Sequence, residues 1–510
     1  MKRFLSIILA MVVTATVIAQ NAFDALKFSQ TRYEGSARSM ALGNAFTSLG
    51  GDIYSLSINP AGSGIYRYSE FIFTPSLVSE NANTTYLSNR ESESRTRLGT
   101  SSLGFVGSIR VGSSPYGLRS INFGIAVNKL NNFTSRSYTS GVNASSSWLG
   151  SLAEGLGGIY KGDLNINDQW DPFRDFPEAS WREILAWNSN LLDPLPDSDF
   201  DYLGATENIR GNQIVHGGDL NQEFFRERGG NLSEMVFNAS VNISDKIFLG
   251  ANIGIQTLNF SDMQKYSETA VTPANFDSKF QTFTHTYKQT SEGMGINMKF
   301  GIIALPFDGF RLGASISTPT WHFIKDEWEE SIYAKYSDGY KSSIESPVGE
   351  YNYRITSPFI WNLGASYVFG KWGLISVDYE GADYSSIRMM TESFDKYQFK
   401  NENDYIADNF RAAQTFRAGA EVKPVENIAL RAGYTKYGNP EKSLGYEAEY
   451  ISGGLGFSSR GGAFIDLAFQ KRLSNNESFS LYSDYTNHAA PVGNMEMSGW
   501  KLLMTIGFRF

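Results

Sequence analysis

The chain contains no cysteine, and only 4 of its 510 residues are histidine. Without cysteine there is no disulfide framework, no thiolate metal site, no cysteine nucleophile and no acylation site for a lipid anchor. The histidines, His216, His285, His322 and His488, are far apart in the sequence, so none forms the pair at helical spacing that a metal motif requires. These absences predict a protein without metal, cofactor or catalytic centre, which is therefore not an enzyme.

Positive charge is also in short supply. The chain has 44 Lys and Arg against 53 Asp and Glu, which gives a net charge of -9. Because nucleic-acid binding needs a basic face, we expect no nucleic-acid partner. Most of the acidic excess lies between Lys161 and Gly230, where 14 acidic residues outnumber 6 basic ones. Such clustering predicts a solvated loop.

Uninterrupted apolar sequence is found only at the start of the chain. Lys2 and Arg3 precede an apolar run from Phe4 to Val17, and small residues end at Ala19. This pattern predicts a signal peptide over residues 1–19 and an exported protein. No later stretch offers the roughly 18 apolar residues that a helical span needs, so no transmembrane helix is expected.

Glycine and aromatic residues are abundant, with 49 Gly, 27 Tyr and 36 Phe, and apolar residues alternate with polar or small ones. At the C-terminus the apolar set of one strand face is Trp500, Leu502, Met504, Ile506, Phe508 and Phe510. In a membrane barrel that face contacts lipid and the other faces the lumen, although the last strand of a soluble sandwich is an alternative. A terminal aromatic also resembles the signal read by the barrel assembly machinery, which we expect to insert the chain.

The same alternation recurs along the chain and predicts about 14 strands, an even number as in bacterial single-chain barrels. Their expected centres are Phe73, Phe105, Phe123, Ala239, Ile253, Ile296, Ala314, Leu363, Val377, Ala418, Leu430, Leu455, Leu467 and Met504. Short turns are expected near Ser114, Asp245, Pro306, Lys371, Pro424 and Arg460, and longer loops near Asn89, Trp181, Thr272, Tyr336, Asn401, Pro440 and Thr486.

A soluble sandwich has no reason to sort its loops to two ends by length. We therefore predict an all-β fold, a transmembrane antiparallel β-barrel over residues 69–510. We expect it as a monomer in the outer membrane of a Gram-negative bacterium, surrounded by outer-membrane lipid.

Residues 20–68 precede the first strand and are rich in glycine and other small residues, which suits a compact plug inside the lumen better than a separate domain. This segment is the predicted hatch.

A long extracellular loop is expected at about 131–230, with two helix-like pieces. The first contains Trp148 and Leu152, and the second opens at Pro177 and contains Trp181 and Leu185. These apolar residues either pack on each other as a lid or present a surface that binds a hydrophobic ligand.

The stretch from Glu34 to Gly62 resembles the FadL-type family of outer-membrane transport proteins. Its matching residues are a small-residue group, an acidic residue and an Asn-Pro-Ala triplet: Gly43, Asn44, Ala45, Asp52, Asn59, Pro60 and Ala61. Later strand, turn and strand units are similar too, so the resemblance covers most of the chain after the signal. It implies a hatch with gating residues inside a 14-stranded barrel, capture of hydrophobic molecules such as long-chain fatty acids, and lateral exit without an energy source. A structural turn is the alternative for the triplet.

Arg417 and Arg431 are expected on the lumen side of their strands, where each could meet a ligand carboxylate or pair with Glu421 or other wall residues. Passive uptake of hydrophobic molecules is the function we expect. The alternative is a barrel subunit of a secretion or surface-attachment complex that binds a protein partner through its long acidic loop. An outer-membrane enzyme would need a clustered Ser-His or Asp-His set at the rim.

Overall fold

The computed structural model describes residues 21–112, 114, 116–442, 447–486 and 488–510. The expected signal peptide lies outside these residues. Within them, no helix has the length and hydropathy needed to cross a membrane.

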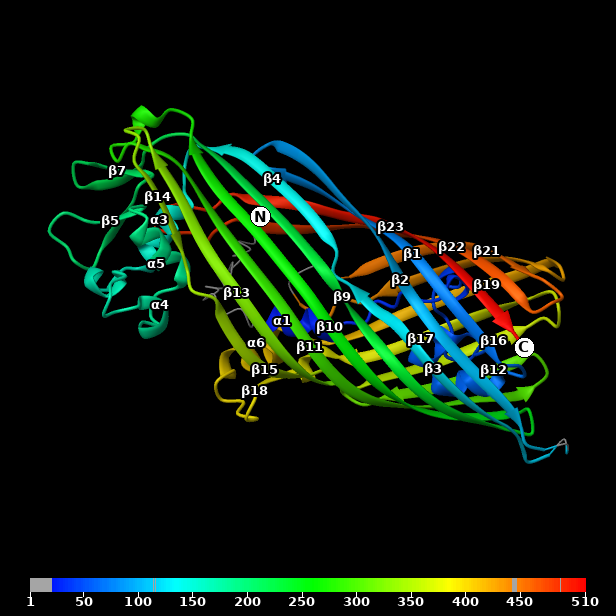
Figure 1. The fold of residues 1–510 in the computed structure, drawn as a ribbon. Coiled ribbons are helices and arrows are strands. Elements are labelled where there is room, and N and C mark those ends of the chain that lie inside the picture. Colours follow the sequence, from blue (N-terminus) through cyan, green and yellow to red (C-terminus); the bar gives the residue numbers. More distant parts are fainter. Residues whose placement is uncertain (1–20, 113, 115, 443–446, 487) are drawn as a thin grey trace, which may run out of the picture.

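The strands form one closed antiparallel barrel (Figure 1). It closes because β1 (Glu70–Tyr86) pairs with both β2 (Asn89–Arg110) and the last strand, β23 (Val492–Arg509). The ring also contains β3 (Leu118–Asn132), β4 (Ser135–Asn143), β9 (Leu220–Ile243), β10 (Ile247–Ala270), β11 (Phe280–Phe307), β12 (Phe310–Ser317), β13 (Trp321–Tyr336), β14 (Lys341–Glu345), β15 (Gly349–Thr356), β16 (Ile360–Val368), β17 (Gly373–Asp383), β18 (Arg388–Thr391), β19 (Ala412–Val425), β20 (Ile428–Tyr437), β21 (Ala448–Ser458) and β22 (Ala463–Ser480).

Four strands of the ring consist of two consecutive pieces: β3 with β4, β12 with β13, β15 with β16, and β17 with β18. The barrel therefore has 14 strands, as predicted. Each predicted centre lies on a different strand of the ring.

Several connections differ from the prediction. The long loop expected near Asn89 is a two-residue turn at Leu87 and Ser88, both with positive φ. The loop expected at 131–230 is shorter, because β4 and β9 take its two ends and leave 144–219. Strand β19 continues through Pro424, so its turn falls at 426–427. At these places the strands extend beyond the apolar alternation into polar sequence. The alternation therefore does not show where these strands end.

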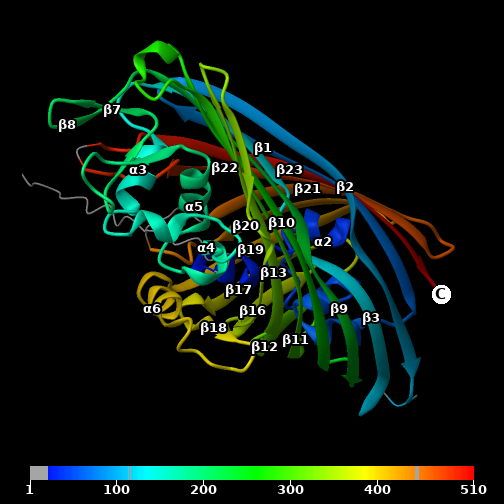
Figure 2. The ribbon, with the colours of Figure 1, turned by 60° about the vertical axis from the view of Figure 1, so that its left-hand side comes forward.

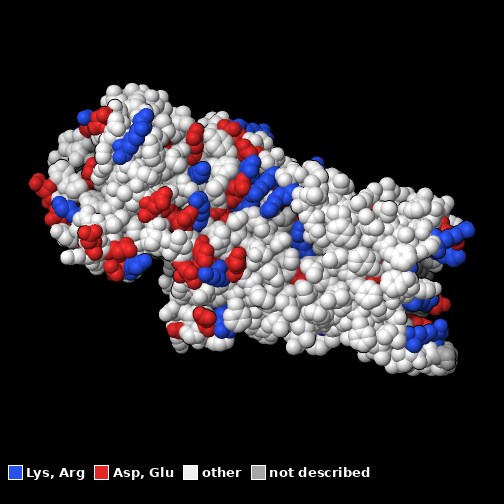
Figure 3. Space-filling model, in the orientation of Figure 1, with Lys and Arg blue, Asp and Glu red and all other residues white. Residues whose placement is uncertain are grey.

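The outer face of the barrel carries an apolar band. On β11 the exposed side chains Met294, Ile296, Met298, Phe300 and Ile302 mark it, a length close to the roughly 9–11 residues of a spanning strand. On β23 the predicted alternation is confirmed, because Leu502, Met504, Ile506 and Phe508 are exposed while Lys501, Leu503 and Thr505 are buried. Figure 3 shows a largely uncharged surface over the right-hand part of the barrel. Charged side chains lie at its right-hand end and over the left-hand part of the molecule.

Residues 144–219 form a cap over one mouth of the barrel, the end that we expect to be extracellular (Figures 1 and 2). The cap holds α3 (Trp148–Gly155), η3 (Lys161–Leu164), α4 (Pro172–Asp175), α5 (Trp181–Asn188), β5 (Leu192–Pro194), β6 (Tyr202–Gly204), β7 (Glu207–Arg210) and β8 (Gln213–His216). The second helical piece begins at Trp181 rather than at Pro177, because Ser180 and Glu183 form a capping box there. Elsewhere lie η4 (Pro273–Asn275), η5 (Tyr384–Ser386) and α6 (Lys400–Asn409).

Candidate functional site: the barrel interior

Residues 21–66, which we call the interior segment, lie inside the barrel (Figures 1 and 2). The segment contains α1 (Ala22–Ser29), α2 (Ala37–Ala41), η1 (Ile53–Ser57) and η2 (Pro60–Ile65). Almost all of it is buried, including polar residues such as Ser39, Ser55 and Ser63. Short helices joined by turns fill the lumen here because the small side chains permit close packing.

The wall is shaped to the segment by glycines that face the lumen. A Cβ atom on Gly313 would lie 2.1 Å from the carbonyl oxygen of Thr47, and one on Gly301 would lie 1.8 Å from the Asn59 side chain. Gly419 and Gly433 leave similar room for the backbone at residues 42–43. The segment therefore packs against wall backbone on several sides.

The residues of the FadL resemblance lie together as a framework of turns and caps. Asn59 Oδ1 accepts from the Ala61 amide (3.0 Å), and Asn59 Nδ2 donates to the carbonyls of Thr47 (2.6 Å) and Ile302 (3.2 Å). Pro60 opens η2 directly after this cap. One side chain thus ties two parts of the segment to β11.

The other members of that set have similar roles. Asp52 caps η1 by accepting from the Tyr54 amide (2.9 Å) and also accepts from the Ser36 hydroxyl (2.7 Å). Gly43 and Asn44 form a turn with φ of 62° and 59°, the left-handed conformation that glycine and asparagine tolerate best. These contacts hold the segment in one shape; a gating role for them stays a prediction.

An ion group links the interior segment to the barrel wall at Glu34, which is fully buried. Lys501 Nζ on β23 donates to Glu34 Oε1 (2.7 Å), and Lys129 Nζ on β3 lies 3.3 Å from Glu34 Oε2. A buried carboxylate requires such partners, because without them its charge would be unpaired in a low-dielectric site.

The wall is interrupted beside this group. Strands β2 and β3 pair only from Ser102 to Arg110 on the β2 side, so in the described residues the two part above Asn128. A register shift in the ladder between β3 and β9 lies beside Leu130, and Gly230 on β9 has a φ of 99° near the same level. This interruption is the wall break.

The interior segment replaces β2 as the neighbour of β3 at the wall break. The Arg32 amide donates to the Leu130 carbonyl (2.8 Å), and the Glu34 amide donates to the Lys129 carbonyl (3.2 Å). Asn131 Nδ2 donates to the Gln30 carbonyl (3.1 Å). The break is therefore closed from inside by residues 30–34.

A cavity of about 670 Å³ lies above the segment, next to the wall break. Its size falls within the roughly 300–1,000 Å³ of small-molecule sites. Its apolar lining is Phe23, Leu26, Phe133, Phe260, Phe479, Met495 and Met497. Its charged lining has six basic residues, Lys27, Arg32, Arg226, Arg228, Arg472 and Lys501, and three acidic ones, Asp24, Glu80 and Glu477. This lining suits a molecule with an apolar body and an anionic head.

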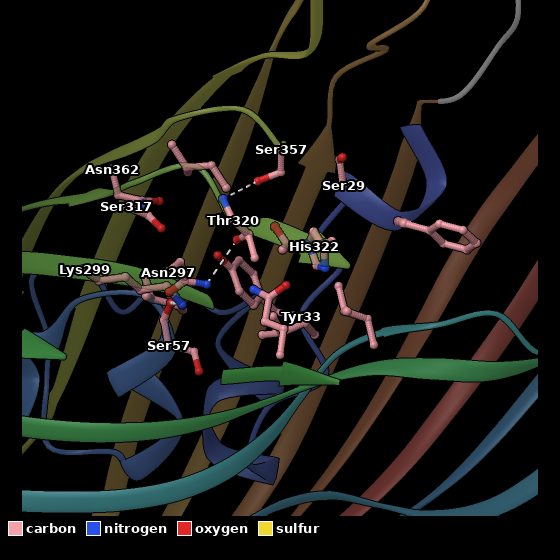
Figure 4. Close-up of a pocket in the computed structure, with 17 residues that line it drawn as sticks. Ser29, Tyr33, Ser57, Asn297, Lys299, Ser317, Thr320, His322, Ser357 and Asn362 are labelled. Atoms are coloured by element: carbon pink, nitrogen blue, oxygen red, sulfur yellow. Dashed lines mark hydrogen bonds between the residues drawn. The ribbon is translucent and has the colours of Figure 1, made fainter. Parts of the chain in front are cut away.

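A second cavity, between α1 and the wall, has a volume of only about 20 Å³ (Figure 4). Polar side chains from several strands converge on it: Asn297 donates to the Thr320 hydroxyl (3.1 Å), and the Thr320 amide donates to Ser357 (2.8 Å). The volume is sufficient for about one water molecule. There is no room for a larger ligand to pass the segment here.

The two arginines predicted in the lumen are both part of the inner wall. Arg417 pairs with Glu380 (2.8 Å), and Arg431 pairs with Glu421 (2.6 Å) and with Asp466. The sequence left two roles open, binding a ligand carboxylate or pairing with wall residues. The contacts in the structure are ion pairs with wall residues.

The four loop residues predicted to bind ligand lie within or beside the core of the cap. Trp148, Leu152 and Leu185 are buried, and Trp181 packs on Trp328 of β13 (5.4 Å between ring centroids). Trp148 stacks on Phe283 of β11. Of the two alternatives for this loop, the packing favours a lid.

Glu268 of β10 fastens the cap to the barrel. It is fully buried and accepts from the Ser147 hydroxyl (2.5 Å), the Trp148 amide (2.9 Å), Gln222 (2.8 Å) and the Tyr266 hydroxyl (2.6 Å). We expect Glu268→Gln to weaken docking of the cap on the barrel by about 1–3 kcal/mol. The NH2 group of a glutamine side chain donates hydrogen bonds, so it cannot accept from the donors that now surround the carboxylate.

The measurement is limited proteolysis of the cap in detergent, where faster cleavage within 144–219 is expected. The exposed Glu178→Gln is the matched control and should cleave at the wild-type rate. Equal rates for both variants would show that Glu268 does not hold the cap.

The sequence analysis missed the charged residues that matter most in the interior: Glu34, Lys129, Arg472 and Lys501. Lys501 could have been found, since the alternation of β23 already places it toward the lumen. The others needed the strand register. Among the described residues, no group of three or more His, Asp or Glu could hold a metal ion.

These features define a class of protein: a closed 14-stranded barrel with an apolar outer band and an interior segment, which is the architecture of bacterial outer-membrane barrels. No protein-family model matches the chain, and no curated protein matches its sequence. Solved structures do match its fold.

The toluene transporter TodX of P. putida has 12% sequence identity and a TM-score of 0.53, over 95% of this chain and 99% of TodX. A Pseudomonas aeruginosa FadL homologue has 10% identity and a TM-score of 0.54, over 94% of this chain and 100% of its own. The toluene transporter TbuX of Ralstonia pickettii has 12% identity and a TM-score of 0.50, over 94% and 99%. The chain therefore has the fold of FadL-type transporters, as the resemblance implied.

Proposed function

We propose that this protein passively takes up hydrophobic molecules across the outer membrane, and that long-chain fatty acids are its ligands. The observation that carries the proposal is the meeting of three features at one place: a cavity of about 670 Å³, the wall break, and the interior segment that closes the break. Gln30 and Arg32 line the cavity and belong to the same stretch, residues 30–34, that is bonded to β3 at the break.

The chemistry of the cavity supports the choice of ligand. The related structures are named for toluene and for FadL, and both names indicate hydrophobic molecules. Toluene has no charge, whereas six basic residues line this cavity. Arginine and lysine bind carboxylates strongly when partly desolvated. A fatty acid matches both the apolar and the basic lining.

The position of the wall break supports lateral exit as part of the proposal. The outward side chains Leu103 of β2 and Val127 of β3 belong to the apolar band, and the two strands part directly above them. A ligand leaving through the break would enter lipid and would not need to cross water. Displacement of the interior segment is the step that opens this route.

Uptake of labelled oleate and of a small sugar into liposomes that contain the purified protein tests the proposal. Wild type is expected to admit oleate and exclude the sugar. Pro60→Leu is expected to reduce the difference between oleate uptake and sugar uptake. Loss of the fixed φ at the start of η2 loosens the cap formed by Asn59.

Pro319→Leu, in the link between β12 and β13, is a control for proline loss outside the segment. Oleate uptake with sugar exclusion in wild type supports a gated hydrophobic transporter. Absence of oleate uptake, or free passage of the sugar, contradicts it.

A partner-binding role is the second candidate, and the acidic surface of the cap favours it (Figure 3). Exposed carboxylates there include Asp168, Asp197 and Asp199. A protein that co-purifies with the full chain, and is lost when residues 148–216 are deleted, would support this role.

A further inference from the structure

A third cavity lies at the end of the barrel opposite the cap, and its lining is mostly basic (Figure 1). Its volume is about 160 Å³, and we call it the basic cavity. Its charged lining consists of four cations and one carboxylate: Arg38, Arg311, Lys371, Lys423 and Glu421. The volume exceeds the roughly 10–15 Å³ that one water molecule needs and is below the roughly 300 Å³ at which small-molecule sites begin. Size and charge therefore favour a small anion.

The four cations come from separate parts of the chain. Arg38 belongs to the interior segment, and Arg311 lies on β12. Lys371 lies in the turn between β16 and β17, and Lys423 lies near the end of β19. Lys371 pairs with Glu426 (3.3 Å), but both side chains are largely exposed, and exposed pairs of this kind are weak. Lys371 is therefore available to a bound anion at the solvent side of the cavity.

Arg311 is the cation whose charge is least compensated. It is half-buried and shares a face of β12 with Gly313, which packs on the interior segment. Its Nη1 donates to the Leu49 carbonyl (2.5 Å). Among the described residues it pairs with no carboxylate, and the charged groups that act on it are the cations Arg38 and Arg67. Burial of a cation without a counter-charge is unfavourable, so an anion beside Arg311 stabilises this arrangement.

Glu421 does not cancel the positive charge of the basic cavity. Its carboxylate pairs with Arg431 (2.6 Å) and also lies near Arg38 (3.5 Å) and Lys423 (3.7 Å). One negative charge is thus shared among three cations. The lining as a whole keeps a net charge of +3.

The two arginines are already oriented by the interior segment. Arg38 Nη1 donates to the Gly51 carbonyl (3.0 Å), and its guanidinium lies 5.3 Å from the centre of the Phe46 ring. Arg311 is held in the same way by the Leu49 carbonyl. Side chains that are fixed before binding lose less conformational freedom when an anion arrives.

We propose that the basic cavity binds a phosphate group. A phosphate carries one or two negative charges and offers several acceptor oxygens to several donors at once, whereas a carboxylate offers two oxygens and a single charge. Inorganic phosphate and the head group of a phospholipid share this chemistry. The proposal goes beyond the proposed function and does not depend on it, because binding is measured without transport.

Titration calorimetry of inorganic phosphate into the purified full chain in detergent tests the proposal. Wild type is expected to bind phosphate at one site and to bind acetate about tenfold more weakly. A difference of this size corresponds to about one additional charge-assisted hydrogen bond.

Gly370 offers a matched pair of variants. It lines the basic cavity, has a φ of 55°, and a Cβ atom built on it would meet nothing within 4 Å. Aspartate and asparagine tolerate this backbone conformation and have nearly the same size. Gly370→Asp is expected to weaken phosphate binding about tenfold or more, because it adds a negative charge beside the cations. Gly370→Asn adds no charge and is expected to bind phosphate as wild type does.

A second pair of variants compares two exposed lysines at the same end of the barrel. Lys371→Gln removes a cation of the basic cavity from a surface turn and is expected to weaken phosphate binding about tenfold. Lys246→Gln removes a lysine from the turn between β9 and β10, outside the cavity, and should bind phosphate as wild type does.

Phosphatidylglycerol distinguishes the two sources of the phosphate group. Native mass spectrometry of the protein released from phosphatidylglycerol vesicles counts the lipids that it retains. A retained lipid that excess inorganic phosphate displaces, and that Gly370→Asp loses, identifies a phospholipid head group. Binding of inorganic phosphate without a retained lipid identifies the free ion.

Three results would overturn the proposal: no saturable binding of either phosphate or phosphatidylglycerol, equal binding of acetate and phosphate, or equal phosphate binding by Gly370→Asp and Gly370→Asn. None of these results bears on oleate uptake, so each would leave the proposed transport standing. Failure of oleate uptake would in turn leave phosphate binding standing.

Discussion

Replacing Ser48 and Ser366 together by cysteine is expected to abolish oleate uptake in the oxidised protein and to restore it on reduction. Ser48 belongs to the interior segment and Ser366 to β16, and their hydroxyl oxygens lie 2.9 Å apart. Cysteine is close to serine in size, so a disulfide fits between these positions with little displacement. Because the natural chain has no cysteine, no other pairing competes.

The crosslink is informative because it leaves the cavity and its charges unchanged. Only the freedom of the segment relative to the wall is removed. The single variants Ser48→Cys and Ser366→Cys serve as controls and should transport in both redox states. Undiminished uptake by the oxidised, fully crosslinked double variant would show that transport needs no displacement of the segment at Ser48.

Gly313→Val is expected to have the opposite effect and to open the lumen to small sugars. A Cβ atom at this position would lie 2.1 Å from the Thr47 carbonyl and 2.6 Å from the Ser48 Cα. These are backbone atoms of the segment, so a side-chain rotation cannot relieve the overlap. The barrel strands pair through their own backbone, and β12 keeps its ladders with β11 and β16. The segment, and not the wall, must therefore shift.

Liposome swelling with a small sugar measures this effect, and protease cleavage within residues 21–66 reports the displaced segment. Gly107→Val is the matched control, because Gly107 meets only the Phe105 ring at 3.4 Å or more and the Phe123 carbonyl at 4.0 Å. It should fold and exclude sugar as wild type does. A Gly313→Val barrel that still excludes sugar would contradict the view that the segment closes the lumen.

The number and order of the strands could be predicted from the sequence because alternation records which side chains contact lipid. On β23, for example, Leu502 and Phe508 are exposed while Lys501 is buried. The same signal fails where strands leave the membrane. At Leu87 and Ser88 both flanking strands are polar, so a tight hairpin looked like a long loop.

The interior residues of the FadL resemblance could be identified, but their contacts could not. Asn59, for example, caps its own turn and also binds the Ile302 carbonyl, 243 positions away. The ion pairs of Glu34 could not be predicted, because its partners Lys129 and Lys501 come from strands far apart in the chain. Residue spacing along a chain carries no record of which inward side chains meet across a lumen.

The sequence by itself determined a 14-stranded barrel with an apolar exterior, because contact with lipid imposes a period of two on every spanning strand. Only the tertiary structure decided where the wall is interrupted, which cavity adjoins the break, and which charges link them. These features depend on strand register and on the packing of residues 21–66 against lumen-facing glycines. Register is set by the closure of the whole ring, so no single strand contains it.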